Sequence, residues 1–216
     1  MKKAVIFGVT GYAGGFIAQE LLDRGFEVAG VARSKPETLD PRIAFEAGSI
    51  HDLDIVERAV AGADVVVLAT RAGMIAADGG TFAQALERIL PVIIAHGARL
   101  GVVGGAGSLR LAGTDIKHMD RPEFNQAQLP EARLHAEALE VLKKHDDTLD
   151  WFYVSPPALF GSYAPGERKG TYRLGKDELL FDEEGNSHIS GQDYAIAFVE
   201  EIEHPAHGRM RFTVAY

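Results

Sequence analysis

The sequence predicts an α/β fold with a doubly wound, mostly parallel sheet and a small hairpin added near the C-terminus. Short apolar runs alternate with longer amphipathic segments in the first half, as expected of parallel strands joined by crossover helices. The run Val65–Ala69 is apolar throughout, which predicts a strand covered on both faces. A length of 216 residues with 46% hydrophobic residues suits one domain, so we expect residues 1–216 to form a single unit.

Strands and helices alternate regularly up to residue 103. The expected strands are Ala4–Phe7, Glu27–Ala32, Ala44–Ala47, Val65–Ala69 and Leu100–Val103, and the expected helices are Gly14–Arg24, Leu53–Val60 and Thr81–His96. Gly25 stands where a helix commonly ends, and Asp52 is suited to cap the second helix. Pro91 should kink or divide the third helix.

The second half is less regular. Residues 108–130 form a long polar stretch, and loops of this length are commonly functional or mobile. A helix (Glu131–Lys144), a strand (Trp151–Val154), a closing helix (Gln192–Ile202) and an edge strand (Arg211–Val214) are expected to follow. Between them, Tyr172–Leu174 and Glu178–Phe181, with a turn signal at residues 184–186, predict an antiparallel hairpin. Residues 155–190 would then form the substrate-side loop and hairpin.

Composition excludes several classes of protein. The net charge of −9 argues against nucleic-acid binding, which depends on clustered Lys and Arg. The absence of cysteine excludes disulfides and thiolate metal sites, and we expect no metal. No apolar run reaches membrane-spanning length. We therefore expect a cytoplasmic protein with no membrane partner.

A glycine-rich loop separates the first strand from the first helix. Its sequence is Gly8-Val9-Thr10-Gly11-Tyr12-Ala13-Gly14. Gly8 suits a tight turn, Gly11 allows close approach of a pyrophosphate, and Gly14 allows close helix–strand packing. The N–H groups of the following helix would face the negative charge. The alternative is a loop that only reverses the chain, but its position between strand and helix favours a dinucleotide site on a Rossmann-type domain.

The end of the second strand bears on the choice of dinucleotide. An acidic residue expected about 20 residues after the loop would bind the ribose hydroxyls of NAD(H), and here the chain reads Ala32-Arg33-Ser34-Lys35. Arg33 and Ser34 suit a 2′-phosphate, so NADP(H) is preferred over NAD(H). Alternatively, Arg33 is a solvated surface residue. Further cofactor contacts are expected from Ser49 and Asp52 near the adenine and from Ala69, Thr70 and Arg71 near the middle of the cofactor.

The helix after the fifth strand contains no Y-x-x-x-K pair of the kind used by short-chain dehydrogenases. Tyr172 and Lys176 have this spacing, but in a hairpin they would not share a face, so we interpret the match as coincidence. Ser108, after the glycines 104, 105 and 107, is the candidate polar anchor for the substrate. His135 is either a proton relay or a surface histidine without a chemical task.

The turn after the sixth strand is the last candidate contact. It contains Pro156 and Pro157. Gly104 and Gly105 form the corresponding turn after the fifth strand. These four residues are expected to border the nicotinamide. A rigid structural turn is an alternative interpretation of the proline pair, and both roles are compatible.

Several segments together resemble the NADH-flavin reductase family of atypical short-chain dehydrogenases. They are residues 8–14, 103–109, 135–139, 151–157, 170–175 and 189–195. The likeness extends more distantly to biliverdin-IX-beta reductase. In that relative a serine and a histidine are associated with catalysis. The serine carries over to Ser108, whereas Ala158 occupies the position of the histidine.

The resemblance implies an NADPH-dependent reductase that transfers a hydride to FMN, FAD or a similar flat, conjugated acceptor, with Ser108 as the anchor. Flavin reduction depends chiefly on stacking the two rings, so the missing histidine is compatible with it. Two alternatives remain: a non-catalytic NADP(H) sensor of the NmrA type, favoured by the missing tyrosine, and a nucleotide-sugar epimerase. Trp151 and the apolar helices suit either a homodimer interface or the core.

Overall fold

A computed structural model describes residues 2–73, 80–145 and 148–216. Its centre is a sheet of strand order β3-β2-β1-β4-β5-β6-β8-β7, in which every neighbouring pair is parallel except β8 and β7. The strands are β1 (Lys3–Phe7), β2 (Glu27–Ala32), β3 (Ala44–Ala47), β4 (Val65–Leu68), β5 (Arg99–Val103), β6 (Trp151–Ser155), β7 (Arg173–Gly175) and β8 (Met210–Ala215). The predicted fold is therefore confirmed as a doubly wound, Rossmann-like fold with a mostly parallel sheet.

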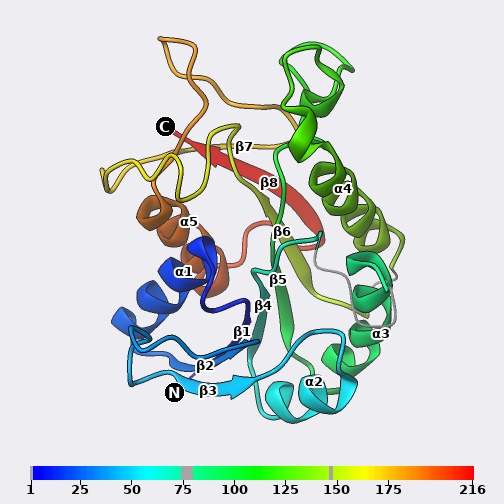
Figure 1. Cartoon of the computed structure of the whole chain (residues 1–216), viewed down its shortest axis with the longest axis vertical. Coiled ribbons are helices and arrows are strands. Elements are labelled where there is room, and N and C mark those ends of the chain that lie inside the picture. Colours follow the sequence, from blue (N-terminus) through cyan, green and yellow to red (C-terminus); the bar gives the residue numbers. More distant parts are fainter. Residues whose placement is uncertain (1, 74–79, 146–147) are drawn as a thin grey trace.

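Helices cover both faces of the sheet (Figure 1). One face carries α1 (Tyr12–Asp23) and α5 (Gly191–Glu203), and the other carries α2 (Leu53–Val60), α3 (Phe82–Ala95) and α4 (Leu129–Lys144). Two short 3₁₀ helices, η1 (His118–Asp120) and η2 (Gln126–Gln128), interrupt the polar stretch before α4. Because each face has its own apolar layer, β4 is buried throughout, as its composition predicts.

Local signals set the helix ends. Gly25 follows α1 with φ +80°, a left-handed conformation that glycine adopts at little cost. The Asp52 side chain accepts hydrogen bonds from the N–H groups of Asp54 and Ile55 and so caps α2. Helix α3 continues through Pro91, which corrects the expectation of a divided helix. Pro91 and Glu87, whose carbonyl loses its helical partner, both lie on the exposed side, where water can replace the bond.

The C-terminal strands differ from the prediction. Strand β8 is an inner strand that pairs with β6 and β7, so the expected edge position is wrong. The antiparallel pair consists of β7 and β8, and residues 178–181 form no strand. Instead, Glu178 forms an isolated bridge with Arg110, and the N–H of Leu179 donates to the Arg110 carbonyl (2.8 Å). A partner so distant in the sequence leaves no local pattern.

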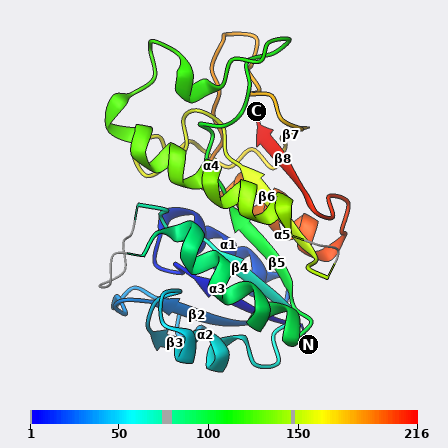
Figure 2. The same cartoon turned by 90° about the vertical axis from the view of Figure 1, so that its right-hand side faces the viewer.

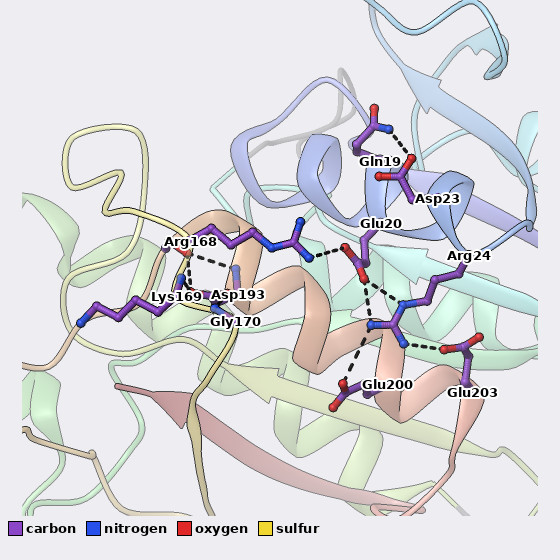
Figure 3. A network of polar contacts seen from close by, with 11 residues as sticks. Gln19, Glu20, Asp23, Arg24, Arg168, Lys169, Gly170, Asp193, Glu200 and Glu203 are labelled. Atoms are coloured by element: carbon purple, nitrogen blue, oxygen red, sulfur yellow. Dashed lines mark hydrogen bonds and ion pairs between the residues drawn. The ribbon is translucent and has the colours of Figure 1, made fainter.

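Polar contacts tie α1 to α5 and to the segment before β7 (Figure 3). Arg24 at the end of α1 contacts Glu20 (2.8 Å) and Glu203 (2.5 Å). Buried Asp193 on α5 accepts hydrogen bonds from the N–H groups of Lys169 (2.7 Å) and Gly170 (2.9 Å). Asp193 therefore braces the segment before β7, while the Ser190 side chain accepts the N–H of Asp193 and caps the helix. This network anchors the 168–170 segment to the body of the domain.

Candidate functional site

The candidate site lies at the carboxyl ends of β1, β4, β5 and β6. Since strand order reverses between β1 and β4, their connections leave toward opposite faces, and such a switch point leaves a crevice in α/β sheets. Two adjoining cavities of about 210 and 640 Å³ occupy this position and share Gly11, Ala69, Thr70 and Arg71 in their walls. Loops after β5 (green) and before α5 (orange) rise at the same end of the molecule (Figure 2).

The glycine loop has the geometry that its sequence predicts. Gly8 adopts φ +86°, and a Cβ there would lie 2.5 Å from the Ala69 carbonyl oxygen. A Cβ on Gly14 would lie 2.2 Å from the Gly8 oxygen, so Gly14 packs helix against strand without lining either cavity. Helix α1 begins at Tyr12, and its N-cap, Gly11, offers no side-chain hydrogen bond, while its first turn contains no acidic residue. Its N-terminus is therefore free to bind an anion such as a pyrophosphate.

The smaller cavity contains most of the residues predicted for the adenosine half of the cofactor. Gly8, Thr10, Gly11, Arg33, Ser34, Ser49, Ala69, Thr70 and Arg71 line it. Arg33 and Ser34 are exposed, and neither forms a side-chain hydrogen bond or ion pair within the described part of the chain. Asp52 lies outside the cavity lining, because its carboxylate is engaged in capping α2. The expected adenine contact of Asp52 is therefore corrected to a structural role.

The larger cavity contains the residues predicted beside the nicotinamide. Tyr12, Ala13, Gly104, Gly105, Pro156 and Pro157 line it together with residues that the sequence did not single out, including Phe124, Gln128, Glu131, Phe160 and Tyr163. A Cβ on Gly104 would lie 1.9 Å from the ring of Tyr153, and this crowding explains the glycine. The cavity therefore combines backbone at its strand ends with aromatic and polar side chains from the later loops.

Ser108 lies elsewhere. It lines a separate cavity of about 650 Å³ beside α4, and its hydroxyl accepts a hydrogen bond from the guanidinium of Arg211 (2.7 Å). Arg211 is buried on β8 and also donates to Asp177 (2.6 Å). Ser108 therefore does not line the cavity in which it was expected to anchor the substrate, and its hydroxyl supplies one of the acceptors that the buried guanidinium requires.

Glu131 and His135 are the acid–base groups that α4 contributes to the larger cavity. Oε1 of Glu131 lies 3.4 Å from Nε2 of His135, and the carboxylate accepts the N–H groups of Ala72 (2.6 Å) and Gly73 (2.7 Å). Burial alone would raise the pKa of Glu131, but the hydrogen bonds from His135 and the two backbone groups outweigh it and lower this pKa. His135 is 9% exposed, so it is not a surface histidine.

The sequence did carry a signal for this pair. Glu131 and His135 have the E-x-x-x-H spacing, which places two side chains on one face of a helix. Their helix follows β5, where a Y-x-x-x-K pair would lie in short-chain dehydrogenases.

Three buried polar atoms of this cavity have no hydrogen-bond partner among the described residues. They are Thr70 Oγ1, His118 Nδ1 and His135 Nδ1. Burial, together with the charge of Arg121, lowers the pKa of His118. Leaving a buried polar group unpaired costs about 1–3 kcal/mol, and native structures contain few such groups. Their concentration around one cavity indicates that it is built to receive a polar ligand.

The residues present therefore fit a nicotinamide dinucleotide. The helix terminus suits the pyrophosphate, the smaller cavity suits the adenosine, and the larger cavity suits the nicotinamide with space beside it. Tyr172 and Lys176, which have the Y-x-x-x-K spacing, do not line the larger cavity. The Tyr172 hydroxyl contacts Glu200, and Tyr172 lines a different cavity next to α5. Trp151 is buried in the core.

Two findings concern other kinds of site. Within residues 2–73, 80–145 and 148–216, no cluster of three or more His, Asp and Glu side chains is arranged to bind a metal ion. In the same ranges, no helix combines the length and hydropathy needed to cross a membrane.

Comparison with known proteins agrees with the site. Residues 8–205 match the family described as NAD(P)H-binding. The Bacillus subtilis protein YwnB is 35% identical over 214 residues, covering 98% of this chain and 97% of YwnB.

Solved structures extend this likeness. A Bacteroides thetaiotaomicron protein, provisionally named an epimerase, is 36% identical with a TM-score of 0.86, covering 100% of this chain and 97% of its own. A Streptococcus pneumoniae protein, provisionally named an NADH-flavin reductase, is 28% identical with a TM-score of 0.82, covering 100% and 99% of the two chains. With the family match over most of its length and the dinucleotide crevice in place, this chain belongs to the NAD(P)H-binding family and has an oxidoreductase-like fold.

Proposed function

We propose that the protein is a reductase that uses NADPH to reduce a flavin, FMN or FAD, or a similar flat, conjugated acceptor. The observation that carries this proposal is the pair of adjoining cavities on either side of Thr70, one beside the glycine loop and one opening over the strand ends. A dinucleotide that fills the first and enters the second would leave room in the second for another ring system.

The proposed preference for NADPH rests on the smaller cavity, which would hold the adenosine half of the cofactor. Arg33 lines the smaller cavity with a guanidinium that has no partner in the described ranges, and no carboxylate lines that cavity. A free guanidinium suits a 2′-phosphate, whereas NADH recognition commonly uses an acidic side chain.

The proposed class of acceptor rests on the larger cavity. A volume of about 640 Å³ lies within the range of small-molecule sites, and Phe124, Phe160 and Tyr163 supply aromatic surface. When bound, NADPH supplies the hydride, and the walls formed by Pro156, Pro157 and the glycine turn would hold the acceptor in place and exclude water. The name of the Streptococcus pneumoniae relative supports the same class of acceptor.

Steady-state oxidation tests the proposal. Purified protein is supplied with NADPH or NADH and with FMN, FAD or no flavin, and absorbance at the reduced nicotinamide band is followed under anaerobic and aerobic conditions. We expect flavin-dependent oxidation with a higher kcat/KM for NADPH. Absence of flavin-dependent turnover with either cofactor would contradict the reductase.

An NADP(H) sensor of the NmrA type is the second candidate. It is favoured by the absence of a tyrosine–lysine pair on the described part of the cavity wall, where Tyr12 and Tyr163 are the tyrosines and no lysine takes part. A sensor would bind NADP(H) with measurable affinity and show no turnover on a panel of flavins, quinones and carbonyl compounds. The epimerase alternative, suggested by the Bacteroides thetaiotaomicron relative, predicts turnover of a nucleotide-sugar without net NADPH consumption.

The remaining expectations are also part of this proposal. We propose that the protein is located in the cytoplasm and acts on a small molecule, without nucleic-acid or membrane partners. We also propose that it can form a homodimer. Cell fractionation tests the compartment, and light scattering at several concentrations tests the homodimer.

A further inference from the structure

Helix α4 presents a carboxylate and an imidazole to the larger cavity. We propose that Glu131 and His135 form an acid–base pair in which charged His135 donates the proton that the acceptor takes up with the hydride. The proposal rests on the proposed function and deepens it, because it restricts the acceptor to compounds whose reduction adds a proton to oxygen or nitrogen. Flavins, quinones and conjugated carbonyl compounds belong to this class.

Glu131 is held in place before any ligand arrives. Its two carboxylate oxygens accept the N–H groups of Ala72 and Gly73, which lie in the segment after β4. These bonds keep the side chain ionised and aimed at Nε2 of His135, 3.4 Å away. A fixed carboxylate at this distance orients the imidazole, as the carboxylate does in other carboxylate–histidine pairs.

His135 is equally constrained. The hydroxyl of Tyr153 donates to its backbone carbonyl (3.1 Å), and the ring of Phe82 packs edge-on at 5.9 Å between centroids. A Cβ on Gly105 would lie 3.1 Å from the His135 Cβ, so the glycine turn closely borders this residue. With Nε2–H directed to Glu131, the second ring nitrogen Nδ1 has no partner in the described part of the chain. In the charged ring, the buried Nδ1–H is the proton that lacks an acceptor in the described part of the chain.

The step is balanced as follows. NADPH gives up a hydride, which carries two electrons, and becomes NADP⁺. The acceptor gains the hydride at one atom and the proton from His135 at another, so that one new bond to hydrogen forms at each. Neutral His135 then regains a proton from water. One NADPH and one proton are consumed for each acceptor reduced.

Other titratable or charged groups around the same cavity are Arg71, His118, Tyr12 and Tyr163. On α4 itself the charged neighbour is Glu131, while β6 contributes the Tyr153 hydroxyl and α3 the uncharged ring of Phe82. His118 is the competing candidate for a proton donor. Its pKa is lowered by burial and by Arg121, and no carboxylate pairs with it in the described residues, both of which favour its neutral form.

A binding measurement tests the pair without turnover. The nicotinamide of NADP⁺ carries a positive charge that NADPH lacks, so a protonated His135 nearby disfavours NADP⁺ selectively. Calorimetric titration gives the Kd of each cofactor from pH 5.5 to 8.5, the range in which histidines ordinarily titrate. We expect the ratio of the NADP⁺ Kd to the NADPH Kd to fall about three- to tenfold as pH rises.

The variants locate the titrating group. His135→Gln should give a ratio independent of pH, whereas the exposed control His96→Gln should behave as the unaltered protein. His135→Asn serves if the glutamine variant does not fold. A pH-independent ratio in the unaltered protein, or a dependence that survives in the His135 variant, overturns the proposal.

The two proposals fail separately. Flavin-dependent NADPH oxidation with a ratio that does not change with pH would support the reductase and contradict the acid–base pair. A pH-dependent ratio that is lost in His135→Gln, without turnover on any flavin, would contradict the reductase and support a titrating His135 beside the nicotinamide.

Discussion

The ring of Tyr153 fills the space in which a side chain at position 104 would have to lie, since a Cβ on Gly104 would come within 1.9 Å of it. The Tyr153 hydroxyl continues beyond that glycine. It accepts the N–H of Gly105 (3.1 Å) and donates to the carbonyl of His135 (3.1 Å). One buried phenol on β6 therefore joins the turn after β5 to helix α4, and both border the larger cavity.

Tyr153→Phe keeps the ring and removes both hydrogen bonds. We expect the free energy of unfolding to fall by about 1–3 kcal/mol, because the partly buried N–H of Gly105 loses its partner and the His135 carbonyl loses the hydrogen bond from the phenol. In a chain of this length this corresponds to a fall in Tm of about 2–10 °C. Thermal unfolding followed by circular dichroism measures it. Tyr163→Phe, at a residue 62% exposed, is the matched control and should leave Tm within the error of the measurement.

Two neighbouring glycines of α1 should respond oppositely to alanine. Gly14→Ala places a Cβ 2.2 Å from the Gly8 carbonyl oxygen, so the loop must move and NADP(H) affinity should fall by at least about tenfold. Gly15→Ala meets its nearest atom at an ordinary 3.6 Å and should raise stability by up to about 1 kcal/mol through helix propensity. Calorimetry and chemical denaturation separate the two effects. Equal behaviour of the two variants would show that the close packing at Gly14 is unimportant.

Arg33→Ala tests recognition of the 2′-phosphate. A charged hydrogen bond contributes about 1.5–3 kcal/mol, so the Kd for NADPH should rise about 10- to 100-fold while the Kd for NADH stays the same. The control is Arg42→Ala, which removes an exposed guanidinium already paired with Asp40 (2.7 Å). An unchanged NADPH:NADH preference in Arg33→Ala would refute the assignment of this residue.

Glu201 makes stability depend on acid. Burial would raise the pKa of its carboxyl, but hydrogen bonds from Arg99 (2.6 Å) and His207 (2.7 Å) outweigh burial and lower it. A lowered pKa stabilises the folded state above the unfolded value of about 4.3, and this stabilisation is lost as pH falls through the folded value. Denaturation midpoints between pH 7 and 3 should therefore decline most steeply below about pH 4.5.

Glu201→Gln isolates this contribution. Removing one partner of a buried ion pair leaves Arg99 with the exposed carboxylate of Asp150 (3.3 Å) as its charged partner and should cost about 3–5 kcal/mol at pH 7. The variant should also lose part of the acid dependence. Glu57→Gln, at an exposed position of α2, is the control and should retain it. If stability fell with decreasing pH to the same extent in Glu201→Gln and in the unaltered protein, the proposed role of Glu201 would be contradicted.

Much of the fold was predictable because its signals are local. The buried run of β4, the Asp52 cap of α2 and the glycine after α1 each depend on a few consecutive residues. The order glycine loop, helix, strand likewise predicts the anion-binding end of α1. These features lie where propensity, capping and packing agree.

The errors concern contacts between distant segments. Ser108 follows the glycine turn, as a cavity residue would, yet its hydroxyl is engaged by Arg211, 103 residues later. The prediction of β8 as an edge strand is wrong because β7 pairs with β8 and forms the edge itself. The spacing of Glu131 and His135 on α4 is visible in the sequence, but the N–H groups of Ala72 and Gly73 that hold the Glu131 carboxylate belong to a distant segment.

The Tyr12 hydroxyl contacts segments more than 150 residues away, donating to the Pro165 carbonyl (3.1 Å) and accepting the N–H of Gly191 (3.1 Å). Its ring also packs against Phe160. The glycine loop that would hold the cofactor and the loops that border the larger cavity are therefore joined by direct contacts and form one unit. Anyone grafting a different substrate loop onto this scaffold would have to redesign the dinucleotide loop with it, and sequence changes on the two sides should be inherited together.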